Sequence, residues 1–194
     1  MAESRHIGAT EIHLNMEKLE EAVHYICSIC TEEDRLGAVK LNKILYYSDM
    51  IHYAKTGASI TGASYAKRQR GPAPKQIRPA MEHLRHQMRL DWKHVPVFEG
   101  ARREFDAHGD TNLSLFSADE IKQIDAMIRF VCDQGAADVS EFSHTIVWSA
   151  ADLGEELPYD TFLVSYLHEP DDAQLQQAAI HLADIEKQDG RIYV

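Results

Sequence analysis

Cysteine is scarce in this chain, and a long apolar run is missing. Three cysteines among 194 residues, Cys27, Cys30 and Cys132, are too few for a disulfide framework, and their odd number fits a reducing compartment. No stretch reaches the roughly 18 apolar residues of a membrane span, and residues 1–10 carry charges where a signal peptide needs an apolar core. We therefore predict a cytoplasmic protein without membrane contact whose cysteines are thiols.

Common signatures of cofactor-binding and hydrolytic enzymes are also absent. The chain has no G-x-S-x-G nucleophile elbow, no Walker lysine loop and no G-x-G-x-x-G, so these modes of hydrolysis and nucleotide binding have little support. Cys27 and Cys30 have the spacing of a zinc or redox pair, but a structural zinc site needs four ligands and no second pair follows. Both lie on an apolar helical face, which favours buried thiols. We predict no cofactor and no metal.

Charge is plentiful but unevenly distributed along the chain, whose formal net charge is −11. Residues 67–103 contain ten Lys or Arg and three acidic residues, whereas residues 104–194 contain four basic and nineteen acidic residues. An acidic total argues against wide nucleic-acid binding, because a duplex repels such a field. The basic segment leaves three uses open: a protein partner, internal neutralisation by the acidic part, or a nucleic-acid-binding regulator that reads through residues 67–103.

Hydrophobic periodicity predicts a predominantly helical α+β domain with about six to seven helices, a short extended segment and a small β-hairpin. We expect the domain over residues 15–190, with flexible ends at 1–14 and 191–194. The first helix should follow an Asn15 cap, and the second should end near Lys55, capped by Gly57. Later helices are expected from Lys75, after a capping box at 117–120, over 138–148 and 158–167, and from Asp171 to just before Gly190.

Two further elements are expected between the second and fourth helices. The third helix should bury Ile77, Ala80, Met81, Leu84 and Met88 and turn Arg78, Arg85 and Arg89 outward. A hairpin should follow, with strands over 92–98 and 102–108.

Some histidine and carboxylate spacings allow an enzymatic alternative. Asp49 and His52 stand at i and i+3 on the second helix, where the carboxylate could orient the imidazole, but a nucleophile is missing. His83 and His86 are three residues apart and could share a metal, although two histidines make a weak site. A metal-dependent hydrolase that uses either pair is the enzymatic alternative.

A proline-flanked turn, Gly71-Pro72-Ala73-Pro74, follows the extended segment. Such a turn is expected to expose rigid backbone. Nearby cations would suit an acidic or planar carboxylate partner. These cations are Arg68, Arg70, Lys75 and Arg78.

The order of these motifs resembles the SocA-like antitoxin family, the Panacea domain. The residues that carry the resemblance are Lys40-Leu41-Asn42-Lys43-Ile44-Leu45-Tyr46-Tyr47, then Gly57, Ile60, Thr61 and Tyr65, then Gly71-Pro72, and finally Phe142-Ser143-His144 and Leu157-Pro158-Tyr159. The resemblance covers residues 16–167. Arg70 stands where the family usually has an aromatic residue, and Ala73 stands where it usually has valine.

The resemblance implies a non-enzymatic antitoxin that binds a toxin protein encoded by a neighbouring gene. In at least some relatives, the antitoxin also acts as a proteolytic adaptor and delivers that toxin to a ClpXP-type protease. From the resemblance and the cationic turn we expect the following partner-binding residues: Tyr46, Asp49, His52, Tyr65, Arg68, Arg70, Gly71, Pro72, Pro74, Lys75 and Arg78.

Overall fold

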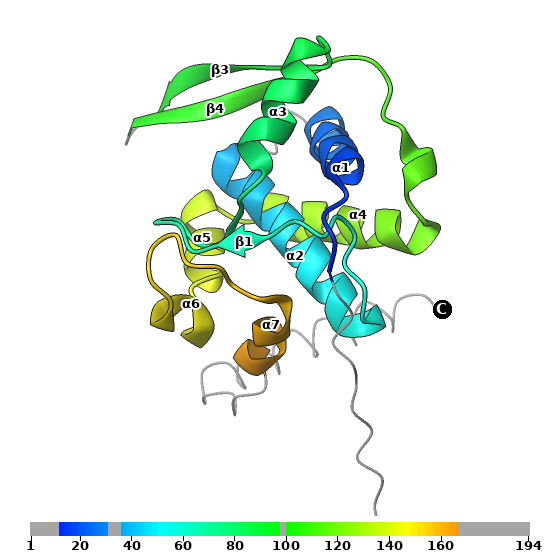
Figure 1. Cartoon of the computed structure of the whole chain (residues 1–194). Coiled ribbons are helices and arrows are strands. Elements are labelled where there is room, and N and C mark those ends of the chain that lie inside the picture. The colour runs from blue at the N-terminus through cyan, green and yellow to red at the C-terminus, as the bar shows by residue number, and fades with distance from the viewer. Residues whose placement is uncertain (1–11, 31–35, 98–99, 167–194) are drawn as a thin grey trace, which may run out of the picture.

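A computed structural model describes residues 12–30, 36–97 and 100–166. In this part of the chain, seven α-helices accompany two small antiparallel sheets of two strands each, which confirms the predicted α+β class. Helix α2 (Ala38–Thr56) runs through the centre, and α1 (Met16–Ile29) and α4 (Ala118–Cys132) pack against it (Figure 1). None of the described helices is both long and apolar enough to cross a membrane.

The central position of α2 follows from its sequence, in which apolar side chains are spread over every side of the helix. Leu41, Ile44, Leu45 and Met50 are at most 2% exposed and contribute to one continuous core. A helix without a polar face is stable only when other elements surround it. Gly57 ends the helix with a φ of 77°, and its N–H donates to the Tyr53 carbonyl, so the predicted C-terminus is confirmed.

Helix α1 begins as predicted, because the Asn15 side chain accepts the Lys18 N–H. Residues 12–14 lie against the body of the protein, since Asn15 N–H donates to the Thr61 carbonyl and Ile12 packs on the core. This differs from the flexible segment expected over residues 1–14. Residues 1–11 lie outside the described part of the chain.

Helix α3 (Ile77–His86) buries Ala80, Met81 and Leu84 as predicted. The prediction is wrong at its end, because Met88 has a φ of 58° and is 83% exposed. Here the chain leaves the helix and enters strand β3, so Met88 lies in the connecting turn. Arg89 does not point outward either, since its guanidinium forms a bidentate ion pair with Glu21 of α1.

The four strands form two separate hairpins. Strand β1 (Tyr65–Ala66) pairs with β2 (Ala73–Pro74), which forms the second half of the proline turn, and Tyr65 lies opposite Pro74. Strands β3 (Leu90–Val97) and β4 (Gly100–Ala107) form the second hairpin, with Leu90 opposite Ala107. This confirms the predicted hairpin and lengthens it. It projects from the helical body beyond α3 (Figure 1).

The second half of the described chain is helical. A short 3₁₀ turn (Leu113–Leu115) precedes α4, whose predicted capping box between Ser117 and Glu120 is present. Helices α5 (Ala136–Phe142) and α6 (Ile146–Ala150) replace the single helix predicted over 138–148, because the Thr145 hydroxyl caps a new helix by accepting the Trp148 N–H. Helix α7 (Tyr159–Tyr166) confirms the next prediction. The helix expected from Asp171 and the tail at 191–194 lie outside the described residues.

Candidate partner-binding surface

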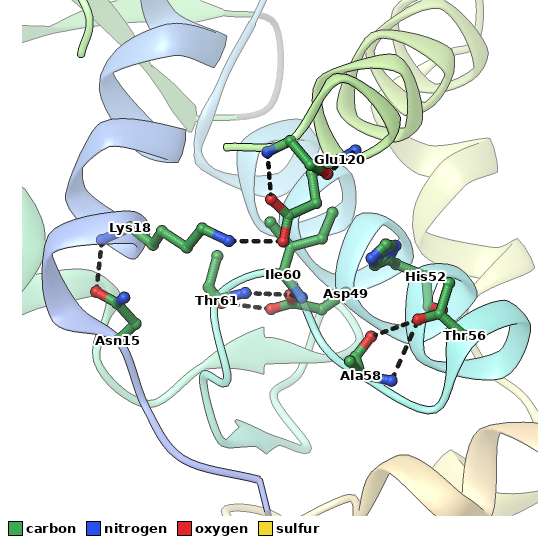
Figure 2. A network of polar contacts seen from close by, with 10 residues as sticks. Asn15, Lys18, Asp49, His52, Thr56, Ala58, Ile60, Thr61 and Glu120 are labelled. Carbon is green, nitrogen blue, oxygen red and sulfur yellow. Dashed lines mark hydrogen bonds and ion pairs between the residues drawn. The ribbon is translucent and has the colours of Figure 1, made fainter. Parts of the chain in front are cut away.

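Asp49 of α2 is fully buried and holds the segment that leads to β1. Its two carboxylate oxygens accept four hydrogen bonds, from Ile60 N–H (2.9 Å), Thr61 N–H (2.7 Å), the Thr61 hydroxyl (2.5 Å) and the Tyr65 hydroxyl (2.7 Å). Figure 2 shows the carboxylate directed from α2 at Ile60 and Thr61. Burial raises the pKa of Asp49, and these four donors counteract the rise. We call this arrangement the Asp49 anchor.

Lys43, two turns earlier on α2, is also buried, at 1% exposure. Its Nζ donates a long hydrogen bond of 3.3 Å to the Pro72 carbonyl. Burial lowers the pKa of Lys43 to about 7, and the side chain forms no ion pair with a described carboxylate. We call this contact the Lys43 anchor of the proline turn.

Gly71 is required by the geometry of that turn. Its φ is 92°, and an added Cβ would lie 2.0 Å from Lys43 Nζ and 2.3 Å from the Ser143 Oγ at the end of α5. The Ser140 hydroxyl of α5 donates to the Arg70 carbonyl at 3.0 Å. The turn is therefore enclosed between α2 and α5, with no room for a side chain at position 71.

The eleven expected partner-binding residues separate into a buried and an exposed group. The buried group contains Tyr46, Asp49, His52, Tyr65, Gly71, Pro72 and Pro74. Our expectation that the turn exposes rigid backbone is thus wrong, because residues 71–74 are covered. Side chains with so little exposed surface can influence a partner only by positioning the segments around them.

The exposed group contains the four cations Arg68, Arg70, Lys75 and Arg78. Lys75 Nζ pairs with Glu156 at 2.5 Å, so this cation is neutralised within the chain. In the part of the chain that the structure describes, the side chains of Arg68, Arg70 and Arg78 form no hydrogen bond or ion pair. These three arginines are available to an acidic partner.

A stacked pair of rings, which the sequence reasoning missed, lies on the neighbouring α5–α6 segment. His144 and Trp148 are parallel within 9°, with centroids 3.7 Å apart, and Lys67 Nζ lies 4.2 Å above the indole. Burial, followed by the charge of Lys43, lowers the pKa of His144. Among the described residues, His144 Nε2 and Trp148 Nε1 have no hydrogen-bond partner. The one indication of this pair in the sequence was that His144 belongs to the Phe142-Ser143-His144 motif.

An apolar groove of about 310 Å³ was also missed. Its lining consists of Tyr47, Ile51, Met127, Phe130, Phe142 and Phe162. Phe142 is 55% exposed and packs edge-on against Phe130, with ring centroids 5.7 Å apart. These aromatic residues come from four helices, so no local sequence pattern could have shown their association.

The geometry gives no support to the enzymatic alternative. The hydrogen bonds of Asp49 go to the 60–65 segment, and none to His52 is present. His83 Nδ1 pairs with Glu20 at 2.8 Å, and its Nε2 lies 3.3 Å from the Gln87 amide nitrogen. Across residues 12–30, 36–97 and 100–166, no three His, Cys, Asp or Glu side chains are grouped so that they could hold a metal ion.

One of the three cysteines is a buried thiol, and the other two face each other. Cys27 is 6% exposed, and burial raises the pKa of its thiol. Cys30 is half-buried, not fully buried as expected, and its Sγ lies 3.8 Å from Cys132 Sγ at the end of α4. Lys40 donates to the Cys132 carbonyl at 3.1 Å, which satisfies one of the terminal carbonyls of α4.

Comparison with known proteins supports one family. The family model described as "Antitoxin SocA-like, Panacea domain" matches residues 41–149, more than half of the chain. That range includes most of α2, the proline turn, the β3–β4 hairpin, α4, α5 and most of α6. No curated protein and no solved structure matches the chain significantly.

Proposed function

Because the chain belongs to the SocA-like antitoxin family with its Panacea domain, we propose that it neutralises a cognate toxin protein by direct binding. The family implies the toxin partner. The observation that supports the binding surface is the set of exposed arginines Arg68, Arg70 and Arg78, which have no acidic partner among the described residues. They lie close in the chain to the proline turn, which the Lys43 anchor and the close packing around Gly71 hold in place.

The proposed surface combines charge with a fixed scaffold. Arg68 and Arg70 lie at the start of the proline turn, and the Ser140 hydroxyl fixes the backbone of Arg70 through its carbonyl. A guanidinium can bind a carboxylate through two parallel hydrogen bonds. Because the backbone of Arg70 is already fixed, less conformational entropy is lost when a partner binds. We assign Asp49, Tyr65, Gly71, Pro72 and Pro74 the role of positioning these arginines.

Co-expression tests the proposal. Each product of the flanking genes should be expressed alone and together with this chain, followed by affinity purification. We expect one product to stop growth when expressed alone, to permit growth beside this chain, and to co-purify with it. If no flanking product is toxic and none co-purifies, the proposed function is wrong.

Charge reversal tests the surface separately from the function. The double variant Arg68→Glu with Arg70→Glu should lose rescue and co-purification, because it opposes an acidic partner. Arg129→Glu, at an exposed position on α4 outside this surface, is the matched control and should behave like the wild type. Equal rescue by both variants would remove the turn from the binding surface.

Delivery of the toxin to a ClpXP-type protease is a further part of the proposal, supported by the family alone. An adaptor should shorten the toxin half-life, because tethering a substrate beside the unfoldase raises its local concentration to about the millimolar range. Trimming residues 1–11 or 191–194 should then stop degradation without changing toxin affinity. A toxin that stays long-lived yet inactive beside the intact antitoxin would show that occlusion suffices.

A regulator that reads nucleic acid through residues 67–103 is less well supported than protein binding. Five of the ten basic residues in this segment form ion pairs with acids of the same chain: Lys75, Arg85, Arg89, Lys93 and Arg102. An acidic side chain therefore lies beside half of these cations, which lowers the attraction of the segment for phosphates.

A further inference from the structure

A second groove, of about 450 Å³ and basic in character, involves α2, α3 and the β3–β4 hairpin. Three arginines line it, Arg78 and Arg85 from α3 and Arg103 from β4, together with Trp92 from β3. Glu82 is the one carboxylate in this lining. The groove therefore has an excess of positive charge, and a single indole forms part of its wall.

Trp92 brings two of these cations together. The guanidinium carbon of Arg85 lies 4.6 Å from the indole centroid, and that of Arg103 lies 5.3 Å from it. Cation–π contacts at these distances hold the guanidinium groups beside the ring. Two like charges held near one ring increase the positive potential of the groove, and an anion bound there would relieve their repulsion.

The arginines of the groove have more N–H donors than there are acceptors around them. A guanidinium has five N–H donors. Arg103 Nε is buried without an acceptor in the described part of the chain, and Arg103 Nη1 faces the weak acceptor Met81 Sδ at 3.8 Å. Arg85 Nη2 pairs with Asp91 at 2.9 Å, but both side chains are about half exposed, so this pair is weak.

We propose that this groove binds a carboxylate side chain, an Asp or Glu within an acidic segment of the protein partner. The inference rests on the proposed function and specifies the chemistry of its partner. Carboxylates match the donor geometry of arginine, and the methylene groups of a glutamate can pack on the indole of Trp92. A nucleic acid fits less well, because a duplex spreads its phosphates over a long surface that three arginines cannot match and that the net charge of −11 repels.

Trp92 itself can report on binding. The chain has two tryptophans, so Trp148→Phe leaves Trp92 as the one fluorophore of its kind. This variant, with its melting temperature checked against the wild type, is titrated at low salt with hexaglutamate and with hexaglutamine. We expect a saturable change in Trp92 emission with hexaglutamate and at least tenfold weaker binding of hexaglutamine.

Matched variants locate the site. In the same background, Arg78→Gln with Arg85→Gln should weaken hexaglutamate binding at least fivefold, whereas Arg129→Gln should leave it unchanged. Equal binding of both peptides, or equal binding by both sets of variants, would overturn the proposal. Displacement of hexaglutamate by a short DNA duplex at lower concentration would also overturn it in favour of phosphate recognition. No toxin is present in this assay, so its failure beside a successful co-purification would reject the groove alone.

Discussion

Asp49 and Lys43 are both buried ionisable side chains of α2, but they hold their segments in different ways. Asp49 receives four hydrogen bonds, two from backbone N–H groups and two from hydroxyls, so each carboxylate oxygen accepts from two donors. Lys43 makes one long bond to the Pro72 carbonyl and has a pKa of about 7. The segment before β1 is therefore fixed by a complete network, whereas the proline turn is fixed mainly by close packing around Gly71.

Because of this difference, we expect the stability of the fold and the binding of the toxin to depend on different residues. A buried network that is fully satisfied rigidifies the fold, and removing its centre leaves several donors without acceptors. A turn held by shape depends on the absence of a side chain at position 71. The exposed arginines beside that turn belong to neither anchor, so they can change without loss of the fold.

The largest expected effect comes from breaking the Asp49 anchor. Asp49→Ala leaves four buried donors unsatisfied and should lower the free energy of unfolding by about 3–5 kcal/mol, measured by urea denaturation. Asp133→Ala, at an exposed position after α4, is the control and should change stability by less than about 0.5 kcal/mol. A loss below about 1 kcal/mol for Asp49→Ala would show that the network is dispensable.

Gly71→Val should have the next largest effect. Its side chain would collide with Lys43 Nζ and Ser143 Oγ, and valine is strained at a φ of 92°, so we expect a loss of about 2–4 kcal/mol in thermal and urea unfolding. Gly57→Val separates the two causes, because Gly57 also has a positive φ but an added Cβ meets nothing within 4 Å. Equal losses for both variants would mean that strain alone matters. Cys27→Ala, which changes ordinary packing, should cost about 1 kcal/mol and leave toxin binding intact.

Lys43→Met should produce a smaller, pH-dependent effect. Because the folded pKa of about 7 lies below the usual value of 10.5, the unfolded chain binds more protons between these values, and the wild type gains stability as the pH rises from 7 to 10.5. This gain should approach at most about 1.4 kcal/mol per pH unit, and Lys43→Met should lack it. If the free energy of unfolding changed with pH in the same way for both proteins over this range, Lys43 would not have the lowered pKa.

The smallest effect on stability is expected at the exposed arginines. Arg68→Glu with Arg70→Glu should change the free energy of unfolding by less than about 0.5 kcal/mol, because neither side chain has a partner in the described structure. The same variant should weaken toxin binding at least tenfold, measured by calorimetry. A large loss of stability would show that these residues belong to the fold.

The sequence predicted local features well and distant associations poorly. The Asn15 cap, the Gly57 terminus, the capping box and the β3–β4 hairpin depend on neighbouring residues, and each was predicted. The split between α5 and α6 was missed because Thr145 was read as part of a continuous helix. Lys43 and Ser143 meet at Gly71 from different elements, and chain order alone does not reveal such a meeting. The burial of Asp49 and Tyr65 was missed for the same reason.

The most direct test of the account is one comparison of three proteins with the purified toxin. Toxin affinity and melting temperature should be measured for the wild type, for Arg68→Glu with Arg70→Glu, and for Asp49→Ala. We predict that the double arginine variant keeps the wild-type melting temperature and loses at least tenfold in affinity, whereas Asp49→Ala melts many degrees lower. Wild-type affinity in the double arginine variant would contradict the central claim that these arginines bind the toxin.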